Sequence, residues 1–218
     1  MVIATHPDDE TLGCGGTLLK HRSKGDATYW IIATAMSKDV GFKPQEIRQR
    51  EREIELVARR YQFSDIISLG HVATMLDQVP MRTVIESIAA AIQKVKPQII
   101  YLPFGGDVHG DHRLVFEAVC SSTKVFRFPS IRRLCMMETL SETEYAPAYG
   151  ARSFAPNHFV DISDFMRDKC EILKIYKSEI GLPPFPRSIA TVRALAAYRG
   201  ANAGCRFAEA FMFLRDLW

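Results

Sequence analysis

The chain has 218 residues, of which 47% are hydrophobic and 24% are charged, and its formal net charge is only +3. This composition is typical of a folded globular protein and excludes a disordered, collagen-like or low-complexity chain. A net charge so close to zero also provides no strong basic field that would hold nucleic acid or an anionic membrane surface.

The length favours one domain of ordinary size, and we expect residues 1–218 to form a single domain. The apolar runs are much shorter than the roughly 20 residues that cross a bilayer, so no membrane span is expected. The first residues contain neither a basic leader nor a signal cleavage site, which predicts a cytoplasmic protein. The five cysteines are odd in number and lie far apart, which argues against a disulfide framework and against a thiolate zinc site.

Apolar runs and amphipathic stretches alternate along the first half of the chain. Short runs rich in β-branched and aromatic residues predict strands at residues 2–5, 27–34, 65–69 and 99–102. Apolar residues at helical spacing predict helices at residues 11–22, 44–61, 81–95 and 111–122. Strands that alternate with helices indicate an α/β fold with a mostly parallel sheet covered by helices on both faces.

The second half of the chain is less regular. Strands are predicted at residues 131–137 and 158–161, and a helix at residues 162–175. Residues 181–188 contain three prolines and are expected to form a loop, which a last helix at residues 189–201 follows. An apolar ending completes the chain.

Acidic residues and histidines follow two of the predicted strands. The run His-Pro-Asp-Asp-Glu at residues 6–10 comes after the first strand, and residues 107–112 follow the fourth. Ligands of open α/β sheets bind at the carboxyl ends of the strands, so we expect the two runs to meet at one site. The alternative is that Asp8, Asp9 and Asp111 only cap the helices that follow them.

The two runs contain donors for a divalent metal ion. His6 and Asp9 lie on one turn, and His112 can supply a third ligand from the neighbouring loop. Two neutral histidines and one carboxylate are typical of a catalytic zinc site that keeps an open position for water. The residual positive charge of such a site acidifies bound water and polarises a carbonyl oxygen. We therefore expect zinc, or another divalent ion such as Fe²⁺, and metal-assisted hydrolysis.

The remaining acidic residues and histidines of the two runs suggest catalytic roles. Asp8 lies beside the expected ligand Asp9 and is expected to act as general base. His109 would stay free to meet the substrate, where an imidazolium could stabilise an oxyanion and later protonate a leaving amine. Either Asp111 or Asp107 is placed to orient His109 and to hold its charge.

These motifs resemble the signatures of a known enzyme family. Residues 6–10 with Leu-Gly-Cys-Gly-Gly at 12–16, and His-Gly-Asp-His at 109–112, are similar to the paired motifs of the PIG-L/LmbE-like zinc-dependent N-deacetylases. Arg-x-x-Glu at 50–53 and Ala-Glu-Ala-Phe at 208–211 are similar to weaker patterns of the same family. The resemblance thus spans almost the whole chain.

The resemblance implies a Rossmann-like fold and a site. By position it implies zinc on His6, Asp9 and His112, with Asp8 as general base and His109 as electrophilic partner supported by the acid at position 111. It also implies that the enzyme removes acetyl from an N-acetylglucosamine-type substrate. The expected partner is therefore a small N-acetylated sugar conjugate, with no nucleic acid and no membrane. Assembly into a homo-oligomer is left open.

Two other functions remain open on the same residues. The first is an amidase that cuts a larger N-acyl group or a thiol conjugate with the same metal centre. The second is a non-catalytic sugar-binding module that keeps the fold. A pure binder needs neither a base nor an acid around an open metal position, which favours an enzyme.

Arg50 is the most informative residue outside the two motifs. It occupies a position of the helix at 44–61 where the apolar stripe predicts an apolar residue. An inward arginine needs an anionic partner, so we expect Arg50 to pair with Glu53 and to reach Asp8 or a substrate oxygen. The alternative is a surface arginine in a helix rich in both charges.

Glycines and one acidic residue carry two further expectations. A dinucleotide-binding loop would need a third glycine three residues after Gly15, where this chain has a leucine. Gly13, Gly15 and Gly16 are therefore expected to bring the first helix close to the sheet instead. Glu209, in the apolar ending, is expected to pair with a cation such as Arg199.

Overall fold

The computed structural model describes residues 1–147, 149–150 and 153–218. Its strands within these residues are β1 (Val2–Ala4), β2 (Tyr29–Ala35), β3 (Asp65–Val72), β4 (Ile99–Pro103), β5 (Arg133–Met137), β6 (His158–Asp161) and β7 (Ala208–Asp216). Its helices are α1 (Asp9–Ser23), α2 (Pro44–Tyr61), α3 (Met81–Val95), α4 (Gly110–Ser122), α5 (Met166–Leu173) and α6 (Ile189–Ala203). Among these residues, every helix is too short or too polar to span a lipid bilayer.

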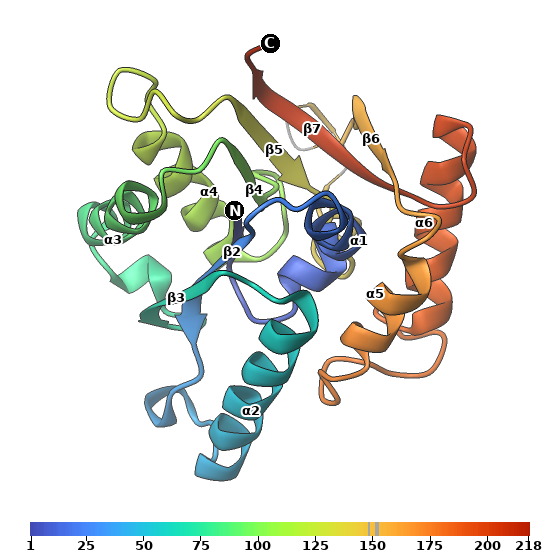
Figure 1. The fold of residues 1–218 in the computed structure, drawn as a ribbon. Coiled ribbons are helices and arrows are strands. Elements are labelled where there is room, and N and C mark those ends of the chain that lie inside the picture. The colour runs from blue at the N-terminus through green and yellow to red at the C-terminus, as the bar shows by residue number, and fades with distance from the viewer. Residues whose placement is uncertain (148, 151–152) are drawn as a thin grey trace.

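The strands form one sheet in the order β3-β2-β1-β4-β5-β7-β6 (Figure 1). Strands β1 to β5 run parallel, and β7 runs antiparallel to its neighbours β5 and β6. The α/β fold with a mostly parallel, Rossmann-like sheet is therefore confirmed.

Helices cover both faces of the sheet (Figure 1). Helices α3 and α4 pack on one face, and α1, α2, α5 and α6 pack on the other. Side chains alternate between the two cores along β1, where Val2 and Ala4 face α1 and Ile3 faces the opposite layer. A strand that is buried on both faces has an unbroken apolar sequence, which explains the short apolar runs.

The sheet has its topological switch point between β1 and β4. From β1 the strand order continues to β2 and β3 on one side, and from β4 it continues to β5 on the other. The crevice outside the carboxyl ends of two such strands is the usual ligand site of an open α/β sheet. Both runs of acidic residues and histidines follow these strands, so the fold brings them to that crevice.

The end of the chain differs from the expectation. The residues expected only as an apolar ending form the nine-residue strand β7, which inserts between β5 and β6. Phe211 of β7 is paired with Met137 on one side and with His158 on the other. Such pairing depends on partners far away in the chain, which residue patterns within the segment do not reveal.

Glu209 of β7 anchors α1. Helix α1 is interrupted at Cys14, whose φ of −145° is not helical. Glu209 accepts hydrogen bonds from two backbone N–H groups just after this break and from Lys169, whose Nζ lies 2.7 Å away. The expected ion pair of Glu209 is thus present, but its partner is not Arg199, which pairs with Glu138 instead.

Gly16 permits the close contact between α1 and the segment that follows β6. A Cβ atom at Gly16 would lie 2.7 Å from the side chain of Ile162, which is fully buried and has no room to move. The expected close approach of the first helix to the sheet occurs at Gly13, where a Cβ atom would lie 2.6 Å from the side chain of Met137 in β5.

We expect Gly16→Ala to lower the free energy of unfolding by about 1–3 kcal/mol, because the added methyl group overpacks the core. Urea unfolding followed by circular dichroism measures this loss. Gly110→Ala is the control, because a Cβ atom there meets no heavy atom closer than 3.9 Å. An equal loss in both variants would contradict the steric explanation.

Candidate metal centre and active site

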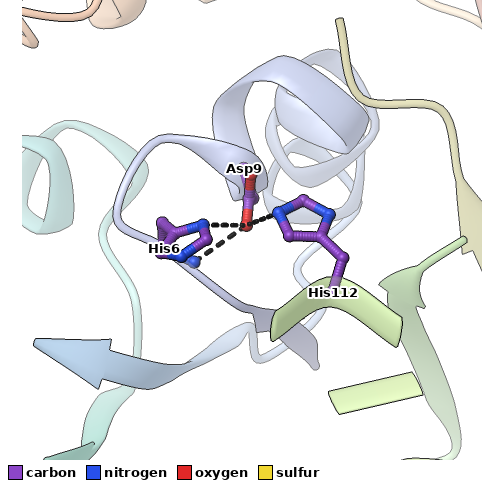
Figure 2. A group of neighbouring side chains, drawn as sticks. All are labelled: His6, Asp9 and His112. Carbon is purple, nitrogen blue, oxygen red and sulfur yellow. Dashed lines mark hydrogen bonds and ion pairs between the residues drawn. The ribbon is translucent and has the colours of Figure 1, made fainter. Parts of the chain in front are cut away.

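The three predicted metal ligands lie together at the carboxyl ends of β1 and β4 (Figure 2). His6 lies in the turn that joins β1 to α1, Asp9 is the first residue of α1, and His112 comes from the first turn of α4. Asp9 Oδ2 lies 3.3 Å from His112 Nε2 and 3.9 Å from His6 Nδ1. One donor atom of each residue lies within 4.8 Å of the others, a spacing that suits a single ion.

The surroundings of His112 test whether this cluster fits a metal ion. Its side chain is fully buried, and Nδ1 lies 2.8 Å from Asp107 Oδ2. Because an ionised carboxylate only accepts hydrogen bonds, the ring proton belongs on Nδ1. Nε2 then offers a lone pair that has no hydrogen-bond partner among the described residues. A buried lone pair that faces a carboxylate fits a metal ligand.

A second group of possible ligands shares one residue with the first. His6, His109 and Asp111 also have donor atoms within 4.8 Å of one another. In this group His109 Nδ1 already accepts the backbone N–H of Asp111 at 3.1 Å, and Asp111 Oδ2 accepts a backbone N–H at 2.6 Å. In the first group Asp9 Oδ2 also accepts a backbone N–H, from His6 at 2.8 Å, so what distinguishes that group is His112 Nε2, which has no hydrogen-bond partner among the described residues.

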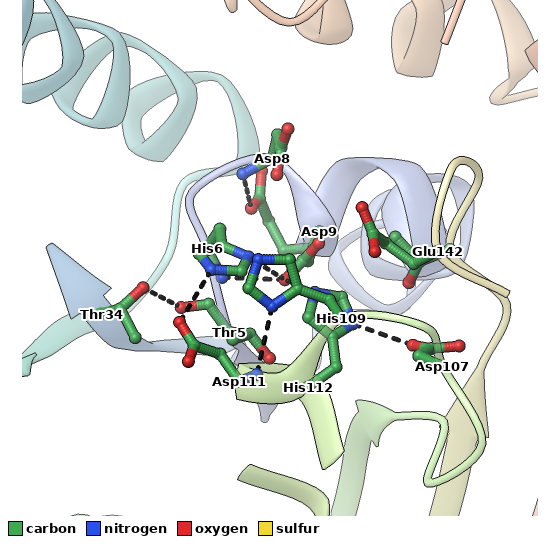
Figure 3. Close-up of polar contacts among 12 residues, drawn as sticks. Thr5, His6, Asp8, Asp9, Thr34, Asp107, His109, Asp111, His112 and Glu142 are labelled. Atoms are coloured by element: carbon green, nitrogen blue, oxygen red, sulfur yellow. Dashed lines mark hydrogen bonds and ion pairs between the residues drawn. The ribbon is translucent and has the colours of Figure 1, made fainter. Parts of the chain in front are cut away.

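The two carboxylates expected to orient His109 contact other groups. The Asp107 side chain contacts His112, and Asp111 Oδ2 lies 3.5 Å from His6 Nε2. Asp111 contacts His109 through its backbone N–H instead (Figure 3). Each of the two candidate histidine ligands thus has a carboxylate beside it, an arrangement that is common around metal ions in proteins.

The surroundings of His109 disfavour a charged ring. Burial, together with the neighbouring His6, lowers the pKa of His109 to about 4. This shift favours a neutral ring at pH 7 over the imidazolium considered from the sequence. Because Nδ1 accepts a hydrogen bond from a backbone N–H, the ring proton belongs on Nε2. A neutral ring of this kind can still donate a hydrogen bond to an oxyanion.

Asp8 has an unusual backbone conformation. Its φ of 136° lies in the region that favours glycine, and its N–H donates to Glu10 Oε2 at 3.0 Å. The buried Asp8 carboxylate accepts a hydrogen bond from Arg187 Nη1 at 2.8 Å. Burial, and then the charge of Asp9, raise the pKa of Asp8 well above its usual range. A strained backbone held in this way is typical of functional sites.

Arg50 is buried, and its expected pairing with Glu53 is confirmed by a distance of 3.1 Å between Nε and Oε2. Its Nη1 donates to the carbonyl oxygen of Pro7 at 2.7 Å, and its Nη2 donates to Glu179. The guanidinium therefore contacts the backbone beside Asp8. Because these contacts are with protein groups, they favour a role in positioning the turn over direct contact with a substrate.

His6, Asp8, Asp9, Arg50 and His109 line a cleft of ≈ 320 Å³, a volume that suits a small molecule, whereas His112 lies buried behind it. The loops after β2 and β5 complete its walls, and they contribute residues that the sequence did not single out, among them Met36, Thr139 and Glu142. Arg187, which also lines the cleft, could have been noticed as a charge within a proline-rich, apolar loop.

Comparison with known proteins relates this chain to deacetylases. The family model described as PIG-L, GlcNAc-PI de-N-acetylase, matches residues 1–122, which contain both runs of acidic residues and histidines. Diacetylchitobiose deacetylase from Thermococcus kodakarensis is 26% identical over 232 residues, which cover 100% of this chain and 84% of the relative.

Two solved structures share the fold. The conserved protein TT1542 from Thermus thermophilus superposes with a TM-score of 0.79 at 24% identity, covering 100% of this chain and 94% of that protein. The N,N'-diacetylchitobiose deacetylase from Pyrococcus horikoshii has a TM-score of 0.77 at 23% identity, covering 98% of this chain and 82% of that protein. At these identities the likeness establishes the architecture.

Proposed function

Because the chain belongs to the PIG-L family of metal-dependent N-deacetylases, we propose that it removes the acetyl group from N-acetylglucosamine-type amino sugars with Zn²⁺ as cofactor. The observation that carries the proposal is the meeting of donor atoms from His6, Asp9 and His112 at the floor of a cleft that Asp8 also lines. The relative from Thermococcus kodakarensis, which is a diacetylchitobiose deacetylase, supports the substrate class.

His6, Asp9 and His112 are the residues that would hold the ion. Two imidazole nitrogens and one carboxylate oxygen form the donor set that catalytic zinc sites use. When bound, zinc polarises the amide carbonyl and lowers the pKa of water, which favours hydrolysis at neutral pH. The buried carboxylate of Asp107 contacts His112, and that of Asp111 contacts His6, so that each carboxylate orients one histidine ligand.

During the reaction Asp8 first accepts a proton and later donates it, while His109 stabilises the oxyanion. Asp8 takes a proton from the attacking water molecule, and its raised pKa makes it a stronger base than an exposed aspartate. His109 donates a hydrogen bond from Nε2 to the oxyanion of the tetrahedral intermediate. When the C–N bond breaks, Asp8 returns the proton to the leaving amine. Water and amide thus become acetic acid and a free amine.

Acetate release from N-acetylglucosamine and its glycosides tests this function. We expect zinc-loaded protein to release acetate, a chelator to stop the release, and added zinc to restore it. Absence of release from every N-acetylated amino sugar in the panel would contradict the proposal. Faster cleavage of longer N-acyl chains or of thiol conjugates would identify the amidase alternative, and sugar binding without hydrolysis would identify a binding module.

Replacing Asp107 by asparagine tests the support of the metal ligand. We expect Asp107→Asn to weaken zinc binding by about 10–100-fold, because Nδ1 of His112 loses its ionised acceptor. Competition with a chromophoric chelator measures the affinity. Asp216→Asn is the control, since this carboxylate pairs with Arg133 at the amino end of β5, the strand end opposite the metal ligands. Equal affinities of Asp107→Asn and the unmodified protein would refute the supporting role.

A further inference from the structure

Arg187 lines the same cleft as the proposed general base and contacts it directly. It is the second-to-last residue of the proline-rich segment 181–188 and precedes Ser188, which caps α6. Its Nη1 lies 2.8 Å from Asp8 Oδ2 and 3.1 Å from Glu179 Oε2. One guanidinium nitrogen carries two hydrogens, so Nη1 donates to both carboxylates at once.

Glu179 connects Arg187 to the other arginine of the cleft. The Glu179 oxygen that does not contact Arg187 accepts a hydrogen bond from Arg50 Nη2. Arg50 in turn holds the carbonyl oxygen of Pro7 at 2.7 Å. Arg50 therefore holds the backbone next to Asp8 while Arg187 holds its carboxylate, and both arginines converge on Glu179. Charges of alternating sign make this network favourable in a buried site.

The backbone and the side chain of Asp8 are restrained by different groups. Glu10 binds the backbone N–H of Asp8 and helps to maintain its positive φ. This contact leaves the side-chain torsions free to rotate. The hydrogen bond from Arg187 to Oδ2 is the contact that restrains the carboxylate itself. Among the described residues, Oδ1 accepts no hydrogen bond and is the oxygen left to take a proton.

We propose that Arg187 is a positioning residue for the deacetylation, which restrains the Asp8 carboxylate through Oδ2 so that Oδ1 accepts the proton of the attacking water. This inference rests on the proposed function. Transfer of a proton requires donor and acceptor within hydrogen-bond reach, and a displacement of about 1 Å can cost about 10²-fold in rate. Arg187 supplies this restraint from an element that contributes no metal ligand.

Kinetics of zinc-loaded variants provide the first test. We expect Arg187→Ala to lower kcat for acetate release by about 10–100-fold and to leave KM within about threefold of its original value. Arg187→Lys should retain part of the activity, and added guanidinium ion should partly restore Arg187→Ala. Arg199→Ala is the matched control, because Arg199 forms a similarly buried ion pair with Glu138 away from the metal ligands. A rise in KM with unchanged kcat would show instead that Arg187 binds the substrate.

The crystal structure of zinc-loaded Arg187→Ala provides a test that is independent of activity. We expect the Asp8 carboxylate to leave its position while Asp9 and the metal ion stay in place. An Asp8 carboxylate that keeps its orientation would overturn the inference. If the unmodified protein releases no acetate, the proposed deacetylation fails, and this comparison still decides whether Arg187 positions Asp8.

Discussion

Asp9→Ala is expected to leave a folded protein that no longer retains zinc and has no acetate release above background. Asp9 is the single anionic donor of the proposed site, and its Oδ2 faces both His112 Nε2 and His6 Nδ1. Removing this oxygen leaves two imidazoles, which is fewer donors than catalytic zinc sites use. Replacing a residue that supports a metal ligand typically lowers metal affinity by about 10–100-fold. We expect the loss of zinc affinity in Asp9→Ala to be larger.

Elemental analysis after dialysis measures the zinc content of Asp9→Ala. A second readout is the melting temperature, which zinc should raise in the unmodified protein but not in this variant, because an ion stabilises only the folded state that binds it. Asp26→Ala is the control. Asp26 lies in the exposed turn after α1 and pairs with His21, in the last turn of that helix, at a distance of 2.7 Å. Full zinc occupancy in Asp9→Ala would refute the ligand assignment.

Asp8→Asn is expected to retain zinc and to lose at least about 10²-fold in kcat, because an amide cannot accept the proton of the attacking water. Asparagine is the appropriate replacement. It keeps an oxygen that can accept the hydrogen bond of Arg187, and it tolerates the φ of 136° better than alanine does. The variant therefore removes the basic group with little change in the geometry of the turn.

Zinc content and acetate release, measured on the same preparation, separate the two aspartates. Asp8→Asn should show full occupancy with little turnover, whereas Asp9→Ala should lose both. Turnover of Asp8→Asn near that of the unmodified protein would exclude Asp8 as the base. Loss of zinc from Asp8→Asn would show that the two neighbouring carboxylates share the ion.

The metal-ligand cluster could be predicted from the sequence because its parts are local to two strand ends. His6 and Asp9 lie within one turn after β1, and His112 follows β4 at the start of a helix. Parallel strands place their carboxyl ends at one edge of the sheet, so any correct assignment of these two strands brings the three donors close together. The alternation of strands and helices along the chain likewise predicted the α/β fold.

The partners of the charged side chains required the folded chain. Arg187 contacts Asp8 across 179 residues of sequence, and Glu209 pairs with Lys169 and not with Arg199. A charged residue has many opposite charges available along the chain, and residue spacing does not rank them. The packing of α5, α6 and β7 against α1 determines which opposite charges become partners. A buried charge must pair with a group that the fold places within hydrogen-bond distance.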